Sequence, residues 1–186
     1  RSVELERLAD RNGAWFVVDG AQSFGATRGE TSGISHGVMA TTSFYPSKPL
    51  GAYGDGGAVF CDDDSLDSVL RSIRNHGAGD DVYVHERIGL TGRLDTIQAA
   101  VLLSKLGIFD QELEERQGVA ERYSHALRDF VATPTLEPGI ESVWAQYTVQ
   151  VDDRERVRAE LLEGGVPTAV FYPQPLHEAP AYQSHS

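Results

Sequence analysis

The chain has 186 residues, 40% hydrophobic and 24% charged, which is the composition of a globular protein and excludes a disordered one. Its 28 acidic residues outnumber its 16 Lys and Arg residues, and a formal net charge of -12 disfavours phosphate backbones, so we predict no nucleic-acid partner. No apolar run approaches the ~18 residues of a membrane helix, and one cysteine excludes an internal disulfide. We therefore expect a cytoplasmic protein without a membrane anchor.

The first half of the chain predicts a helix followed by three strands. Residues 1–13 have a helical pattern that ends at Gly13. Three short continuous apolar runs follow this helix. Such runs are typical of strands that are buried on both faces of a parallel sheet. The strands are expected over residues 14–18, 38–44 and 57–61.

Three helices are expected after the last of these strands, over residues 65–76, 94–109 and 112–130. Asp64 is predicted to cap the first. Asp95 followed by Gln98 predicts a capping box at the helix N-terminus, in which each of the two side chains accepts a hydrogen bond from the backbone N–H of the other residue. The second helix carries enough apolar residues that we expect it to be mostly buried.

Residues 134–139 (PTLEPG) mark a domain boundary. The pattern beyond it predicts a strand (144–151), a helix (153–163) and a strand (166–172). We therefore divide the chain into 1–133 and 134–186. Because the chain opens inside a helix and closes without a final element, we interpret it as an internal fragment.

The polar residues that could support chemistry concentrate between Asp19 and Gly57. Asp19 ends one predicted strand, Ser43 ends another, and Lys48 follows within five residues. Ligand sites in open α/β sheets lie at the carboxyl ends of strands, so these three residues and Gln22 are expected to converge. Pyridoxal phosphate needs such a set: a lysine amine, a carboxylate against the ring nitrogen and a phosphate pocket.

Each of these residues also has an ordinary interpretation, and these alternatives stay open. Lys48 could be a solvated loop lysine, Asp19 a turn cap and Ser43 a local hydroxyl cap. Lys105, the other lysine in the chain, is interpreted as a helix-side lysine whose stem lies on apolar surface. No metal site is predicted, because His76, His85 and Glu86 lack zinc-type spacing.

Several stretches resemble the sugar aminotransferases of the DegT/DnrJ/EryC1/StrS family, which are fold-type I pyridoxal-phosphate enzymes. The resemblance spans roughly residues 3–182 and keeps the family's motif order: VVDGAQSFGA, SFYPSKPLGAYGDGGAVF, RSIRNHG, IGLTGRLDTIQAAVLLSKL and VPTAVFYPQPLH. It implies an α/β fold, with part of the large parallel or mixed-sheet cofactor domain, helices on both faces, and part of a small α+β C-terminal domain.

The resemblance also implies roles for individual residues. Lys48 would bind pyridoxal 5′-phosphate covalently and move the proton, with pyridoxamine phosphate as the intermediate form of the cofactor. Asp19 would pair with the pyridinium nitrogen, Gln22 would lie near the phenolic oxygen, and Ser43 would hold the phosphate.

Further roles implied by the resemblance concern substrate and partner. In a homodimer with shared sites, the segment after Ile88 would cross into the partner's site, where Thr91 replaces a family Asn at the phosphate. Arg93 would face the substrate, because a planar two-pronged donor suits a sugar carboxylate. Tyr172 and His177 would also contact substrate.

The function implied is amino transfer from glutamate to a nucleotide-linked keto-sugar. The SFYPSKPLG wording is similar to that of UDP-2-acetamido-2-deoxy-3-oxo-glucuronate aminotransferases, which serve O-antigen and other surface-polysaccharide synthesis. A non-catalytic truncated remnant and a dehydratase relative are the alternatives, although the dehydratases carry His in place of Lys48. Because family members are longer, the 186-residue chain alone is expected to retain cofactor weakly or not at all.

Overall fold

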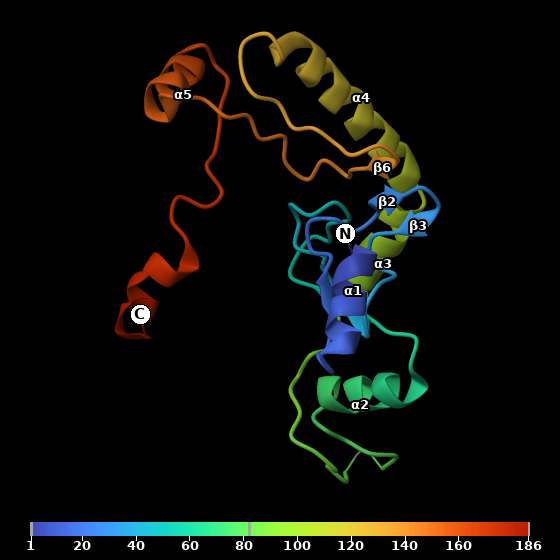
Figure 1. Cartoon of the computed structure of the whole chain (residues 1–186). Coiled ribbons are helices and arrows are strands. Elements are labelled where there is room, and N and C mark those ends of the chain that lie inside the picture. Colours follow the sequence, from blue (N-terminus) through green and yellow to red (C-terminus); the bar gives the residue numbers. More distant parts are fainter. Residues whose placement is uncertain (1, 82, 186) are drawn as a thin grey trace.

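The computed structural model describes residues 2–81 and 83–185, which form five α-helices, six short strands and two 3-10 helices in these ranges (Figure 1). In chain order they are α1 (Ser2–Arg11), β1 (Val17–Asp19), β2 (Thr27–Arg28), β3 (Thr31–Ser32), β4 (Met39–Ser43), β5 (Gly57–Phe60), α2 (Asp64–Arg74), α3 (Thr96–Leu106), α4 (Phe109–Leu127), β6 (Ile140–Glu141), α5 (Arg154–Glu163), η1 (Leu176–Glu178) and η2 (Pro180–His185). No helix in these ranges is long and apolar enough to cross a membrane.

The central sheet has the order β1-β4-β5 and is mixed. β1 runs parallel to β4, with Asp19 opposite Thr41, and β5 runs antiparallel to β4, with Gly57 opposite Ser43. The three strands expected from the sequence are therefore present, each a little shorter than predicted.

The prediction that residues 14–18 are buried on both faces is wrong. Trp15 is 78% exposed and Val17 is 45% exposed. The physical reason is that β1 has β4 as its one neighbour in the described chain, so apolar side chains suited to a sheet interior have nothing packed against them.

The main core lies between the sheet, the loop after β4 and helices α3 and α4. Its buried residues are Phe44, Leu50, Ala52, Leu102 and Phe109, and Phe24, Ala58, Leu94 and Leu113 pack against them. The second predicted helix is divided at Gly107, where α3 ends. It is also less buried than expected, since Leu102 and Phe109 are its two buried residues.

Two predicted caps differ from the structure. Asp63, not Asp64, caps α2, and its carboxylate accepts from the backbone N–H groups of Ser65 and Leu66. Asp95 makes no side-chain cap hydrogen bond at α3. Gln98 is not its reciprocal partner, because its amide oxygen accepts instead from the backbone N–H of Tyr53.

The second sheet, β3-β2-β6, joins the two halves of the chain antiparallel, with Arg28 opposite Ile140. Beyond it, α5 forms as predicted, but the described structure has no strand over 144–151 or 166–172. A strand needs a hydrogen-bonded neighbouring strand. In the described structure, residues 144–151 have a single isolated bridge, between Gln150 and Ala132. The division at 134 stays a prediction.

Candidate functional site

The carboxyl ends of β1 and β4 form one edge of the central sheet because the two strands are parallel. β1 ends at Asp19 and β4 ends at Ser43. The backbone just after β1 stays close to β4, since the Gly20 N–H donates to the Thr41 carbonyl at 2.7 Å. The buried Thr42 hydroxyl donates to the Gly20 carbonyl at 3.3 Å. This edge therefore presents a carboxylate and a hydroxyl on a tightly bonded backbone.

Asp19 is the last residue of β1 and Gln22 lies on the turn that follows it, and both are exposed. Asp19 Oδ1 accepts from the Ala21 backbone N–H at 3.0 Å, which holds the carboxylate in one orientation. Gln22 Oε1 accepts from Gln146 Nε2 at 3.4 Å. That contact brings a residue 124 positions further along the chain to the site, and no local pattern could have identified it.

Ser43 and Lys48 lie at the start of the loop that joins β4 to β5. Ser43 Oγ accepts from the Tyr45 backbone N–H at 3.2 Å, so its own hydrogen remains available for donation. The Lys48 backbone N–H donates to the Tyr45 carbonyl at 2.9 Å. Lys48 is half-buried, and its amine makes no hydrogen bond or ion pair with any residue in 2–81 or 83–185.

This donor set fits pyridoxal phosphate in its chemistry. It offers a carboxylate for a protonated ring nitrogen, a hydroxyl for a phosphate oxygen and an unpartnered amine for an aldehyde. Asp19 and Ser43 end strands at the sheet edge, Lys48 lies on the loop after β4, and Gln22 lies on the turn after β1.

Thr91 and Arg93 belong to a separate cluster at the C-terminal end of α2. Arg93 Nη1 donates to Asn75 Oδ1 at 2.9 Å and contacts His76 Nε2 at 3.0 Å. The other ring nitrogen of His76 lies 3.3 Å from Thr91 Oγ1. His76 has a φ of 63°, a conformation that costs a non-glycine residue energy and turns its ring between the other two side chains.

A hollow of about 640 Å³ adjoins this cluster, and Arg71, Arg74, Arg87 and Arg93 contribute to its walls, together with Asp80 and Glu86. Sequence reasoning selected Thr91 and Arg93 but missed His76 and Asn75 as their partners. The RNHG motif indicated that this segment has a functional role, but the motif alone did not indicate which side chain would contact Arg93.

Tyr172 and His177 lie in the C-terminal segment, which Figure 1 shows in red, apart from the central sheet. Both side chains are exposed. The nearest charged group to His177 is Glu178, with 3.9 Å between ring nitrogen and carboxylate. The structure does not bring these two residues to Lys48, and their substrate role stays a prediction.

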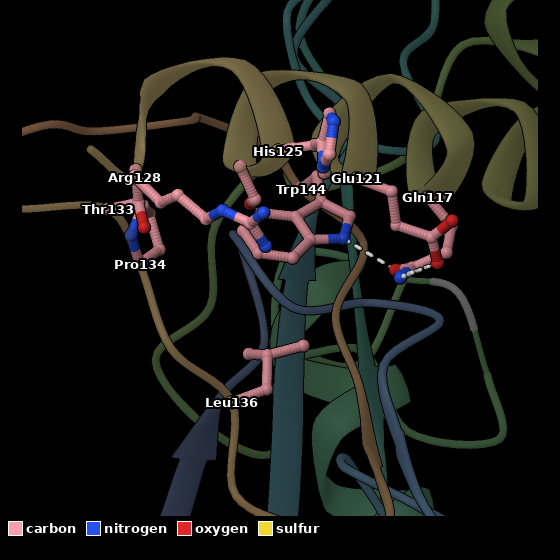
Figure 2. Close-up of a pocket in the computed structure, with 10 residues that line it drawn as sticks. Gln117, Glu121, His125, Arg128, Thr133, Pro134, Leu136 and Trp144 are labelled. Atoms are coloured by element: carbon pink, nitrogen blue, oxygen red, sulfur yellow. Dashed lines mark hydrogen bonds between the residues drawn. The ribbon is translucent and has the colours of Figure 1, made fainter. Parts of the chain in front are cut away.

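A different hollow, of about 410 Å³, lies between α4 and residues 133–144 (Figure 2). Trp144 occupies its centre, and its indole Nε1 donates to Gln117 Oε1 at 2.6 Å. The charged residues around it are Glu121, His125 and Arg128. None of the residues predicted for catalysis lines it.

Lys105 is predicted to be a helix-side lysine whose stem lies on apolar surface, and the structure adds two contacts of its amine. Its Nζ donates to the Gly51 carbonyl at 2.6 Å and lies 5.7 Å from the centroid of the Tyr53 ring. Together with Gln98, it contacts the backbone of the loop that carries Lys48. Their spacing of seven residues on one helix was the available signal.

The family model described as DegT/DnrJ/EryC1/StrS aminotransferase family matches residues 3–186. The chain belongs to this family. It is 48% identical over 178 residues to UDP-2-acetamido-2-deoxy-3-oxo-D-glucuronate aminotransferase of Pseudomonas aeruginosa, covering 95% of this chain and 49% of that protein. The solved structure of a DegT DnrJ EryC1 StrS aminotransferase from Brucella abortus is 44% identical, with a TM-score of 0.95 over 98% of this chain and 49% of that one.

These comparisons confirm the predicted family and the fold-type I aminotransferase architecture. The chain spans about half the length of the curated relatives it matches, as the fragment interpretation expects. A further structure, of a Bacillus subtilis protein with bound cofactor PMP, is 25% identical, with a TM-score of 0.85 over 98% of this chain and 43% of that one. The predicted pyridoxal-phosphate dependence is thereby confirmed for the family.

Proposed function

We propose that the protein containing this chain is a pyridoxal-phosphate-dependent aminotransferase that transfers the amino group of glutamate to a nucleotide-linked keto-sugar. The observation that supports the proposal is that Asp19 and Ser43 end two parallel strands at one sheet edge, with Lys48 on the loop that follows Ser43, in a chain of an aminotransferase family. The substrate class we propose is a UDP-linked 3-oxo-hexuronic acid, used in surface-polysaccharide synthesis such as that of O-antigen. The activity of the Pseudomonas aeruginosa relative supports that class.

When bound, pyridoxal phosphate supplies an aldehyde and an electron-withdrawing ring that together carry an amino group from one substrate to the next. Asp19 holds the ring nitrogen protonated, and the Ala21 N–H fixes the carboxylate in place for that role. Ser43 donates its hydroxyl hydrogen to the phosphate. Gln22 lies at the phenolic oxygen and is oriented by Gln146.

Lys48 has two roles in this proposal. When the cofactor is bound, the amine would condense with its aldehyde with loss of water, and, once displaced by the incoming amino group, it would take a proton from the donor carbon and return one to the acceptor carbon. Both roles need the neutral amine for part of the cycle. Lys48 is half-buried and its amine bonds none of the described residues, so it is available to react with an aldehyde.

The second cluster would act across a homodimer. Arg93 would bind the sugar carboxylate in the partner's site, with Thr91 at the phosphate. The contacts from Asn75 and His76 use Nη1 of Arg93 and orient the guanidinium. Its other donors are engaged by no residue within 2–81 or 83–185, so they remain for a two-pronged bond to a carboxylate. Tyr172 and His177 would complete the substrate contacts.

The test is borohydride trapping with pyridoxal phosphate, in the 186-residue chain and in the longest reading frame that contains it. Lys48 and Lys105 are the two lysines in the chain, so peptide mass mapping assigns the adduct to one or the other. We expect the adduct at Lys48 and none in Lys48→Ala. Glutamate should then bleach the absorbance of the unreduced protein and release 2-oxoglutarate. No adduct at Lys48 in either length of protein would contradict the proposal.

A further inference from the structure

The loop between β4 and β5 holds Lys48 at its start and is anchored in the core further along. Leu50 is 3% exposed and Ala52 is 1% exposed. The Ala52 backbone N–H donates to the Phe44 carbonyl at 2.8 Å, which closes the loop back onto the end of β4. Between Lys48 and Gly51 stand Pro49, whose ring fixes its φ, and the buried Leu50. Little slack therefore separates the Lys48 backbone from that of Gly51.

Helix α3 holds this loop through two polar side chains. Lys105 Nζ donates to the Gly51 carbonyl at 2.6 Å, and Gln98 Oε1 accepts from the Tyr53 N–H at 2.8 Å. The two side chains are seven residues apart, close to two turns, so they project from the same face of the helix. They bind an acceptor and a donor two residues apart on the loop.

The backbone at Gly51 depends on this contact. Gly51 is buried, and a Cβ there would lie 2.5 Å from the Pro46 carbonyl oxygen, so the chain passes too close to itself for any larger residue. Its carbonyl accepts no other hydrogen bond from residues 2–81 or 83–185. A buried carbonyl without a donor is costly, and the charge-assisted bond from Lys105 removes that cost.

We propose that Lys105 and Gln98 are positioning residues, which fix the backbone of residues 49–53 and thereby the direction from which the Lys48 amine reaches the site. This inference rests on the proposed function, because it assigns Lys48 its covalent role. The two lysines then have different roles, since Lys48 reacts and Lys105 holds the reacting loop in place.

The experiment compares Lys105→Met, which keeps the apolar stem but removes the donor, with Lys105→Arg, which keeps a donor. Gln98→Met removes the second contact independently, and Ser104→Ala, an exposed neighbour on α3, is the matched control. The first readout is amide hydrogen exchange at residues 50–53, since Pro49 has no backbone N–H. The second is the pH profile of the rate at which Lys48 captures pyridoxal phosphate before borohydride reduction.

We expect Lys105→Met to speed amide exchange in this loop about tenfold or more, since a hydrogen bond to a charged group is lost. We expect Lys48 capture to slow by a similar factor, and Lys105→Arg to restore most of both. Gln98→Met should change both readouts in the same direction, and it decides the matter if Lys105→Met unfolds. Faster exchange with an unchanged capture profile would overturn the inference, as would equal behaviour of Lys105→Met and Ser104→Ala.

The two proposals fail differently. If the unaltered protein captures no cofactor at Lys48, the proposed function fails, whereas amide exchange at residues 50–53 still reports whether Lys105 and Gln98 hold the loop. If capture at Lys48 is normal and insensitive to both substitutions, the proposed function stands and the positioning inference fails.

Discussion

Leu102 and Leu103 are adjacent leucines on α3, and truncation of each to alanine should have very different effects on stability. Leu102 is 5% exposed and lies in the core with Phe44, Leu50 and Phe109, whereas Leu103 is 72% exposed. Leu→Ala removes the branch carbon and both methyl groups. At ~0.8 kcal/mol per buried carbon the transfer loss at Leu102 is ~2–2.5 kcal/mol, and the cavity left behind raises the total to ~3–4 kcal/mol.

The assay is urea unfolding of the chain, followed by circular dichroism and by tryptophan fluorescence. We expect Leu102→Ala to lower the free energy of unfolding by ~3 kcal/mol, which corresponds to a melting temperature ~6–12 °C lower. Leu103→Ala should stay within ~0.5 kcal/mol of the unaltered chain. Equal losses for the two variants would refute the reasoning, because they would mean that α3 buries the other face or both faces.

Three further predictions concern a cap, a hydroxyl and two glycines. Hydrogen bonds from the Ser65 side chain and from two backbone N–H groups hold the pKa of Asp63 below its ordinary 3.8. The stabilisation of α2 by the Asp63 carboxylate should therefore be present above pH 3.8 and lost as the pH falls through the lower folded-state pKa. Hydrogen exchange should show this pH dependence, and Asp63→Asn should abolish it. Tyr147→Phe keeps the ring but removes a 2.8 Å bond to a hydroxyl on α4, and chemical denaturation should show a loss of ~0.5–1.5 kcal/mol; an unchanged midpoint would contradict that bond. Gly20→Ala would place a Cβ 2.7 Å from an isoleucine methyl, so it should destabilise by ~1–3 kcal/mol, whereas Gly118→Ala, in open space on α4, should stabilise by ~0.5–1 kcal/mol.

Most of the candidate site could be predicted from the sequence, because its parts are local. An acid or hydroxyl at the end of an apolar run identifies the end of a strand, and parallel strands bring such ends to one edge. This reasoning leads to Asp19 and Ser43, whose strands run parallel side by side, and to Lys48 on the loop that follows, and the roles of all three stay predictions. The scarcity of lysine narrows the choice of the amine further, since Lys48 and Lys105 are the two candidates.

The long-range contacts of this region could not be predicted, because the partners come from far along the chain. Gln146 contacts Gln22 from 124 residues away, and Lys105 contacts Gly51 from 54 residues away. Gln98 illustrates the limit most clearly. Its spacing from Asp95 is that of a capping pair, yet its amide bonds the Tyr53 backbone instead, because the loop after β4 packs against α3 and offers it an N–H.

The sequence by itself determined the chain order of the first three strands and of the helices, and the family, since these depend on the period and order of residue types. The tertiary structure decided which apolar residues are buried, because burial depends on neighbours that the period does not name. Leu102 and Leu103 fit the same pattern and differ in exposure by more than tenfold. Residues 14–18 and 144–151 carry the pattern of buried strands, but strand formation and burial require adjacent backbone and side chains, and the described chain supplies few of them.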